Sequence, residues 1–164
     1  MVPIVAFVGS SGAGKTTLLK NLISILKKRG HRVGAIKHTH HEFEIDKPGK
    51  DSYEMKAAGA ESVCILSSTK LALVRDLTKE VSLEEIAEKF FSEVDIVLAE
   101  GFKEYSVPHI AVVRPENQVP NVAQLIAVVS DIARTKLKID REIVLFGFDE
   151  VSELAEVLEK NFLR

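Results

Sequence analysis

The sequence predicts an α/β fold in three layers, with a central, mostly parallel β-sheet and helices on both of its faces. Short, often β-branched apolar runs alternate with longer segments in which apolar residues recur every three or four positions. Several of the short runs lack alternating polar residues, as expected for strands that helices cover on both faces. The predicted strands span residues 4–8, 33–36, 63–66, 71–74, 96–99, 110–113, 125–129 and 143–146.

Helices are predicted between and after these strands. The first begins near Lys15, carries leucines at helical spacing and stops at Gly30. The second has a capping box, in which the side chains of Ser82 and Glu85 each bond a backbone N–H of the other residue. The third begins after Asp149 and has one apolar face. This alternation predicts right-handed crossovers, while two closely spaced runs in the middle of the chain predict an antiparallel edge.

The composition is that of an ordinary globular chain, and we expect residues 1–164 to form one domain. The 22 Lys and Arg against 24 Asp and Glu give a net charge of −2, which argues against coating nucleic acid or an anionic membrane. Cys64 is the single cysteine, so no intramolecular disulfide forms, and its apolar run predicts a buried, inert thiol. Residues 2–8 are apolar but lack a basic flank and a cleavage site, so a cytoplasmic location is expected.

A phosphate-binding motif follows the first predicted strand. Its three glycines allow backbone conformations in which successive N–H groups point at phosphate oxygens, and the following helix adds the positive end of its dipole. Lys15 supplies a positive charge for the β- and γ-phosphates, and the Thr16 hydroxyl is a candidate Mg²⁺ ligand. The motif places the chain among P-loop nucleoside triphosphatases and makes the domain a nucleotide-binding one. It reads Gly9-Ser10-Ser11-Gly12-Ala13-Gly14-Lys15-Thr16.

Such a site needs an acidic residue near the metal, and the segment 95–101 offers two. Ligands bind at the carboxyl ends of parallel strands, and Asp95 lies roughly 16 Å further from that edge than Glu100. We therefore expect Glu100 to act at the metal, Gly101 to allow close approach of the γ-phosphate, and Asp95 to be a polar residue at the strand entrance. The competing interpretation of Glu100 is a solvated acid at a strand end.

Three histidines follow the second strand in the segment Lys37-His38-Thr39-His40-His41. This segment lies where a substrate or a switch would be placed. Three interpretations remain open: Lys37, His38, His40 and His41 bind an anionic substrate or partner, the histidines bind a transition metal, or the loop is merely polar.

The next loop, residues 46–52, combines turn residues with acids and lysines and has the composition of a nucleotide-sensing switch. Its Asp51 has two interpretations. In one, the carboxylate is catalytic and holds a metal-bound water; in the other, it caps the helix that begins at Ser52.

Several of these segments together resemble the MobB family, the molybdopterin-guanine dinucleotide biosynthesis proteins B. The resemblance extends over nearly the whole chain. The segments that carry it are the loop ending in Thr16-Thr17, Lys37-His38-Thr39-His40-His41, residues 46–52, Ala57-Ala58-Gly59-Ala60 and Glu100-Gly101-Phe102-Lys103.

The resemblance implies a GTP-binding protein with weak, Mg²⁺-dependent GTPase activity that serves molybdenum cofactor biosynthesis. It implies a homodimer that assists a MobA-type guanylyltransferase in attaching GMP to molybdopterin, and contact with molybdopterin or a molybdoenzyme is also considered. By position, Gly12, Gly14, Lys15 and Thr16 would bind phosphate and Mg²⁺, with Thr17 beside them and Glu100 as the second acidic element.

The base is the least determined part of the ligand. The element Asn-Lys-x-Asp, by which many GTPases recognise guanine, is absent, so GTP is implied by the resemblance alone. Asp131, after the strand 125–129, is placed to accept hydrogen bonds from guanine N1 and N2, with Arg114-Pro115 ending a neighbouring strand; a turn cap is the alternative.

Two other functions stay open for the whole chain. One is a non-enzymatic adaptor in which nucleotide orders residues 46–52, and the other is a small-molecule kinase whose histidine segment holds an anionic acceptor.

Overall fold

A computed structural model describes residues 1–39, 41–140 and 142–163. The chain divides into two compact units, one of residues 1–38 and 83–164 and the other of residues 39–82. The sequence predicts a single domain over the same residues. Each unit is described by itself below.

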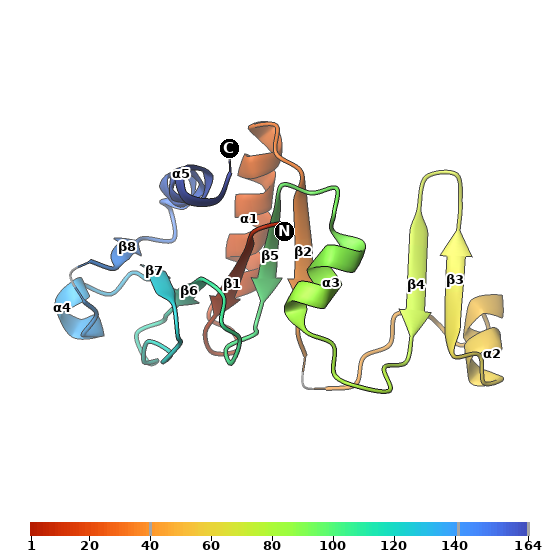
Figure 1. Ribbon diagram of the computed structural model, residues 1–164. Coiled ribbons are helices and arrows are strands. Elements are labelled where there is room, and N and C mark those ends of the chain that lie inside the picture. The colour runs from red at the N-terminus through yellow and green to blue at the C-terminus, as the bar shows by residue number, and fades with distance from the viewer. Residues whose placement is uncertain (40, 141, 164) are drawn as a thin grey trace. The chain divides into compact units, whose positions relative to one another are not determined.

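The larger unit is built on a six-stranded sheet in which every neighbouring pair is parallel (Figure 1). β1 lies inside the sheet, between β5 and β6, so its carboxyl end is flanked on both sides by other strand ends. This arrangement gathers the segments that follow the strands at one edge of the sheet. Across the sheet the order is β2 (Val33–Lys37), β5 (Ile96–Glu100), β1 (Ile4–Val8), β6 (His109–Val112), β7 (Leu125–Val129) and β8 (Val144–Phe146).

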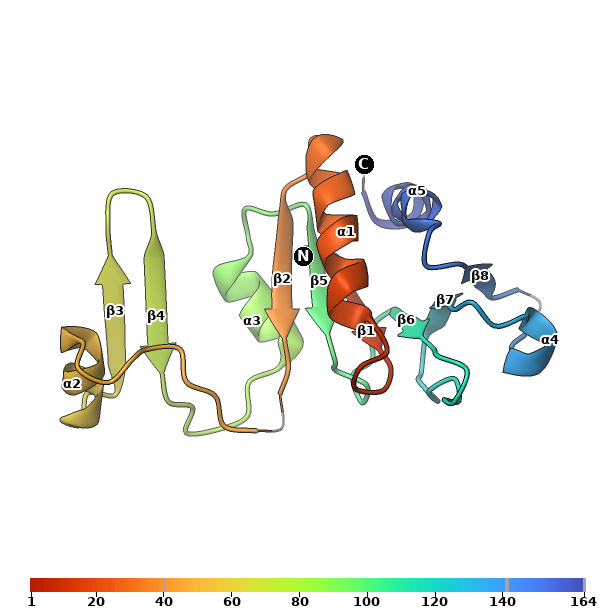
Figure 2. The same ribbon diagram turned by 180° about the vertical axis from the view of Figure 1, so that it is seen from behind.

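Helices cover both faces of this sheet, which confirms the predicted fold class. Alternate residues of β1 enter separate cores: Val5 and Phe7 pack in the core that contains α1 and α5, and Ile4 and Ala6 pack in the core that contains α3. Figures 1 and 2 accordingly show α3 and α1 on opposite sides of the strands. The helices of this unit are α1 (Lys15–Lys28), α3 (Leu83–Phe90), α4 (Arg134–Leu137) and α5 (Val151–Phe162).

The smaller unit consists of α2 (Asp51–Ala57) and an antiparallel pair, β3 (Ser62–Leu66) and β4 (Leu71–Arg75). The antiparallel pairing is as predicted, but the pair forms a two-stranded sheet of its own and not an edge of the main sheet. Within this unit Lys56 pairs with Asp76.

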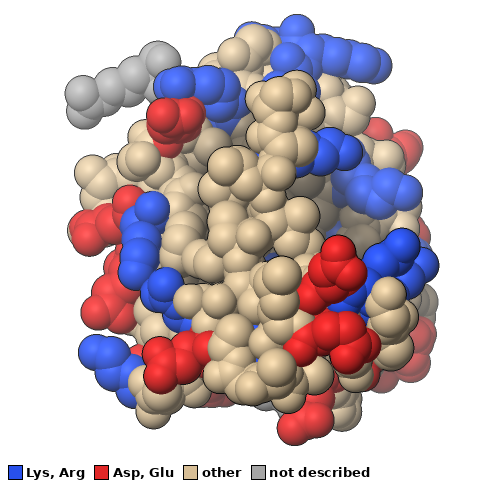
Figure 3. Space-filling view, turned by 90° about the vertical axis from the view of Figure 1, so that its right-hand side faces the viewer, with Lys and Arg blue, Asp and Glu red and all other residues tan. Residues whose placement is uncertain are grey.

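One side of the β3–β4 pair leaves apolar side chains in contact with solvent. Leu66 and Leu71 are opposite each other in the register and are 73% and 67% exposed. Cys64 shares their side of the pair and is exposed, so the predicted buried thiol is wrong. The other side of the pair carries Val63, Ile65 and Val74, which line a pocket together with α2. Figure 3 looks from the side where Figure 1 shows α2, and residues other than Lys, Arg, Asp and Glu lie along the middle of that view. No helix among the described residues is long and apolar enough to cross a membrane.

An ion pair at the opposite end of β5 from Glu100 joins β2 to β5. Arg32 Nη2 lies 2.7 Å from Asp95 Oδ1, and the backbone N–H of Arg32 donates to Asp95 Oδ2 at 2.7 Å. The hydrogen bond from the Arg32 guanidinium, followed by the one from its backbone N–H, lowers the pKa of Asp95 to about 2. Asp95 is therefore a structural residue at the strand entrance, as the sequence predicts.

We expect Asp95→Asn to lower the melting temperature at pH 7 and to have progressively less effect as the pH falls from about 4 to 2. A carboxylate whose pKa is depressed in the folded state stabilises the fold above its unfolded pKa, near 3.9, and loses this contribution as it is protonated. Thermal melts of both proteins across this range measure the effect. Glu88→Gln, at an exposed position of α3, is the control; a pH-independent difference between wild type and Asp95→Asn would contradict the assignment.

Candidate nucleotide-binding site

The glycine-rich loop, residues 9–14, connects β1 to α1 at the carboxyl edge of the sheet. Gly9, Gly12 and Gly14 have positive φ angles of 150°, 75° and 98°, which side chains disfavour. Gly14 is the N-cap of α1 in a left-handed conformation, so the helix begins directly at Lys15. A loop of left-handed glycines that ends in a helix start is a suitable environment for an anion.

The first glycine of the loop also lies against the neighbouring strand. A Cβ atom on Gly9 would lie 2.2 Å from the carbonyl oxygen of Val112, at the end of β6. That oxygen belongs to the backbone of the central sheet and cannot turn away as a side chain would. The loop therefore leaves β1 along a path that only glycine can take.

Lys15 folds back over the loop. Its ammonium group donates hydrogen bonds to the carbonyl oxygens of Gly9 and Ser10, both at 2.8 Å. The side chain spans the loop from the first turn of α1 to the end of β1. Its positive charge is consequently held in the mouth of the loop.

Thr16 and Glu100 meet beside the loop. The Thr16 hydroxyl donates to Glu100 Oε2 at 2.8 Å, although the two residues are 84 positions apart in sequence. The Nζ atom of Lys37 lies 3.6 Å from Glu100 Oε1, because Lys37 and Glu100 are register partners at the ends of β2 and β5. The structure thus brings together three of the predicted site residues.

The pair of Thr16 and Glu100 suits a magnesium ion. Mg²⁺ prefers six oxygen ligands and is commonly held by one or two protein oxygens, with water and substrate phosphates as the others. A hydroxyl and a carboxylate beside a phosphate-sized loop are such a donor set. Among the described residues, no three His, Cys, Asp or Glu side chains gather into a metal cluster.

The segment after β5 turns sharply and is fixed from the core. Gly101 and Phe102 have positive φ angles of 97° and 61°. His109, fully buried on β6, places its Nε2 atom 3.1 Å from the carbonyl oxygen of Phe102, and its Nδ1 atom has no hydrogen-bond partner. The ring of His38 lies 5.1 Å from the ring of Phe102. His38, one of the predicted histidines, is thereby located next to the Glu100-Gly101 segment.

On the other side of β1, Arg114 contacts the glycine-rich loop. Its Nε atom donates to the carbonyl oxygen of Ala13 at 3.2 Å, and its Nη1 atom donates to Asp131 Oδ2 at 3.3 Å. The guanidinium carbon lies 3.8 Å from the centre of the Phe148 ring. Arg114 therefore joins the loop to the segments that follow β7 and β8.

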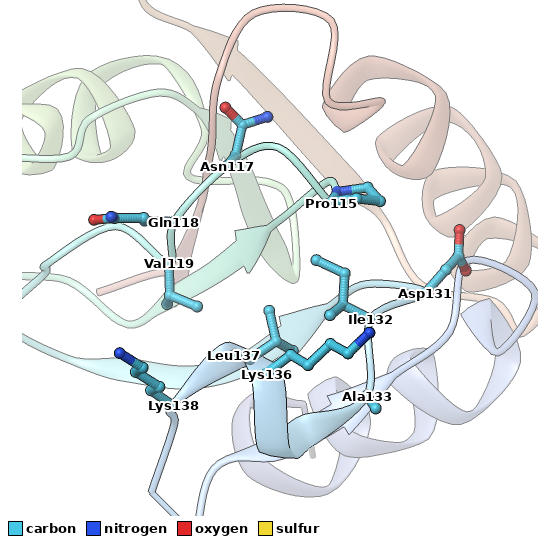
Figure 4. A pocket seen from close by; sticks show the side chains of 10 residues that line it. All are labelled: Pro115, Asn117, Gln118, Val119, Asp131, Ile132, Ala133, Lys136, Leu137 and Lys138. Carbon is cyan, nitrogen blue, oxygen red and sulfur yellow. The ribbon is translucent and has the colours of Figure 1, made fainter.

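A pocket of about 930 Å³ lies between the segments that follow β6 and β7 (Figure 4). It is connected to the glycine-rich loop by a hydrogen bond of 2.8 Å from the Ser10 hydroxyl to Asn117 Oδ1. Asp131 lies at one end of the pocket in Figure 4, and Gln118 and Lys138 lie at the other.

The remaining predicted residues of the site belong to the smaller unit or lie outside the described residues. Asp51 is the first residue of α2, in the smaller unit, and its catalytic role stays a prediction. The N-cap position of α2 is Lys50, so Asp51 is not the cap. His41 also belongs to the smaller unit, and His40 lies outside the described residues.

The loop before α2 is ordered by its own side chains. The Asp46 carboxylate accepts the backbone N–H of Lys47 at 2.9 Å. A hydrogen bond from the Ser52 side chain, and then the one from Lys47, lower the pKa of Asp46. The predicted switch loop thus has internal contacts, and its response to nucleotide stays a prediction.

The family model described as "MobB: Molybdopterin guanine dinucleotide synthesis protein B" matches residues 4–131. The chain belongs to the MobB family. It is 39% identical to the molybdopterin-guanine dinucleotide biosynthesis adapter protein of Escherichia coli K12, over 95% of this chain and 91% of that protein. It is 37% identical to the protein of the same name from Haemophilus influenzae, over 96% and 88% of the two chains.

Solved MobB structures share the fold of this chain. A crystal structure titled molybdopterin-guanine biosynthesis protein B has a TM-score of 0.76 at 30% identity and covers 98% of this chain and 99% of its own. The Bacillus subtilis MobB structure has a TM-score of 0.77 at 25% identity, over 96% and 97% of the two chains.

Within this MobB fold, sequence reasoning missed His109 and Phe148 as contributors to the site and placed Arg114 only at the end of a strand that neighbours the strand before Asp131. His109 precedes an apolar run, and a polar residue beside a buried strand is a weak signal of a buried hydrogen bond. Phe148 carries no motif. Its nearness to Arg114 depends on the sheet order, in which β6 and β8 are the two neighbours of β7.

Proposed function

We propose that this chain binds GTP with Mg²⁺ and hydrolyses it slowly, and that it serves as an adapter in molybdopterin guanine dinucleotide biosynthesis beside a MobA-type guanylyltransferase. The observation that carries the proposal is the meeting of Lys15, Thr16 and Glu100 at one glycine-rich loop. The names of the Escherichia coli and Haemophilus influenzae relatives support the adapter role.

The proposed chemistry depends mainly on positioned charge. The backbone of residues 9–14 and the start of α1 hold the triphosphate, while the Lys15 ammonium offsets charge that develops on the β- and γ-phosphate oxygens. Mg²⁺, when bound, neutralises the phosphate charge and orients the leaving group. Thr16 and Glu100 would hold that ion directly or through water.

Mg²⁺ should raise the GTP affinity of wild type, and we expect this gain to be about tenfold smaller in Glu100→Gln. The reason is that an amide ligates the ion less strongly than a carboxylate. Titration calorimetry with GTP, in Mg²⁺ and in EDTA, measures this gain. Asp95→Asn is the matched control, since it changes the acid that precedes the same strand, at the end opposite Glu100. Equal Mg²⁺ dependence in wild type and Glu100→Gln would contradict the metal assignment.

The adapter role suggests that hydrolysis responds to a partner. The smaller unit exposes the apolar side chains of Leu66, Leu71 and Leu73, a surface suited to a second copy or to the transferase. Single-turnover hydrolysis with and without the transferase and its pterin substrate separates the possibilities. Stimulation by either indicates a GTPase coupled to transfer, and unchanged turnover indicates a nucleotide-dependent adaptor.

A further inference from the structure

The sheet order assigns opposite sides of β1 to the two ends of a bound nucleotide. Glu100 follows β5 on one side and contacts Thr16, so the metal and the terminal phosphates belong there. On the other side, the segments after β6, β7 and β8 contribute Arg114, Asp131 and Phe148. If the phosphates lie in the loop with the metal at the β5 side, the nucleoside extends toward these three residues.

We propose that Asp131, Arg114 and Phe148 form the base subsite and that Asp131 makes it selective for guanine. This inference rests on the proposed triphosphate site and names its base specificity. Arg114 is placed against the loop at Ala13, and its guanidinium would lie 3.2 Å from a Cβ atom on Gly14. The three side chains are therefore adjacent to the point where α1 begins.

The stacking part of the subsite already exists. The Arg114 guanidinium lies on the Phe148 ring at 3.8 Å, which is a short cation–π contact. Planar guanidinium groups and aromatic rings are the surfaces on which proteins stack nucleobases. A purine can stack on Arg114, whose side chain is 37% exposed, or replace Arg114 on Phe148, and either arrangement accepts any purine.

Asp131 supplies the selectivity. A carboxylate only accepts hydrogen bonds, and guanine presents two adjacent donors, N1–H and the 2-amino group. Adenine presents an acceptor at N1 and therefore opposes a carboxylate there. Arg114 contacts Oδ2 of Asp131 and holds the side chain toward the loop, and Asp131 is 58% exposed, so a base can reach it.

The pocket that Asp131 helps to line supplies the space. Its volume of about 930 Å³ is at the upper end of small-molecule sites and is sufficient for a nucleoside. The Ser10–Asn117 hydrogen bond connects its wall to the loop. The pocket thus adjoins the phosphate loop through Asn117 and the proposed base subsite through Asp131.

The test is the base preference of wild type and Asp131→Asn, measured by calorimetry in Mg²⁺ with GTP, ATP and xanthosine triphosphate. We expect wild type to prefer GTP and Asp131→Asn to bind it at least tenfold more weakly. The same variant should bind xanthosine triphosphate more tightly, because the asparagine amide donates to the C2 carbonyl of xanthine. Asp140→Asn, at another exposed position of this segment, should match wild type.

Phe148→Leu provides an independent measurement. It should weaken GTP and ATP by similar factors and leave their ratio unchanged, since stacking does not distinguish the purines. Equal GTP and ATP affinities in wild type, or a parallel loss of both in Asp131→Asn, would overturn the base assignment while leaving the phosphate site intact. Failure of wild type to bind GTP, ATP or inorganic triphosphate would overturn the proposed function itself.

Discussion

Replacement of Lys15 by alanine is expected to lower the affinity for Mg²⁺-bound GTP about 100-fold, or about 2.8 kcal/mol. The ammonium group lies in the mouth of the loop at 2.8 Å from two of its carbonyl oxygens, where triphosphate charge would concentrate. An alanine there leaves the phosphates with backbone N–H donors and no positive side chain. Titration calorimetry measures the loss, and a single-turnover assay should show a parallel loss of hydrolysis.

The control for this variant is Lys20→Ala, which removes the same charge from an exposed position on the same helix. It separates a local effect at the loop from a general effect of net charge. GTP affinity close to that of wild type is expected for Lys20→Ala. If Lys15→Ala also binds GTP with wild-type affinity, the loop is not the triphosphate site and the proposed function is wrong.

Gly9→Ala is expected to destabilise the fold by roughly 2–5 kcal/mol and to abolish GTP binding. Its Cβ would lie 2.2 Å from the Val112 carbonyl oxygen, and the φ angle of 150° is unfavourable for alanine. Relief of the contact requires β1 to separate from β6, and the loop would then lose its shape. Urea unfolding gives the change in stability, and calorimetry gives the change in binding.

Gly12→Ala distinguishes steric contact from backbone strain. Gly12 also has a positive φ, 75°, but a Cβ there would have no neighbour within 4 Å. Strain alone should cost about 1–2 kcal/mol. Equal stability of the Gly9→Ala and Gly12→Ala variants would show that the close approach to Val112 does not constrain the loop.

Local sequence pattern and strand geometry were sufficient to predict most of the elements and site residues of the larger unit. The rise per residue in a strand predicted that Asp95 and Glu100 lie at opposite ends of β5, and the structure places them there. Asp95 pairs with Arg32, and Glu100 accepts a hydrogen bond from Thr16. The glycine-rich motif located the loop because its function depends on consecutive residues. Both inferences needed only neighbours in sequence and a direction along one strand.

Long-range packing explains what the sequence did not reveal. An apolar run indicates a tendency to be buried, but burial of Cys64 requires an element to cover its side of the β3–β4 pair, and it is exposed. The contact between Arg114 and Ala13 joins residues 101 positions apart. No local pattern specifies such a pair, because it depends on β1 and β6 being neighbours in the sheet.

If phosphate binds at this loop as proposed, Lys15 would exchange its hydrogen bonds to the loop for hydrogen bonds to the phosphate. Two of the three ammonium hydrogens are used by Gly9 and Ser10, so a phosphate that takes more than the remaining one would compete with carbonyl oxygens for the same donors. The free energy that Lys15 contributes to binding would be the difference between its hydrogen bonds to phosphate and its hydrogen bonds to the carbonyl oxygens. This difference is smaller than the free energy of either set. The same two hydrogen bonds make the side chain an internal crosslink that joins the first turn of α1 to the end of β1.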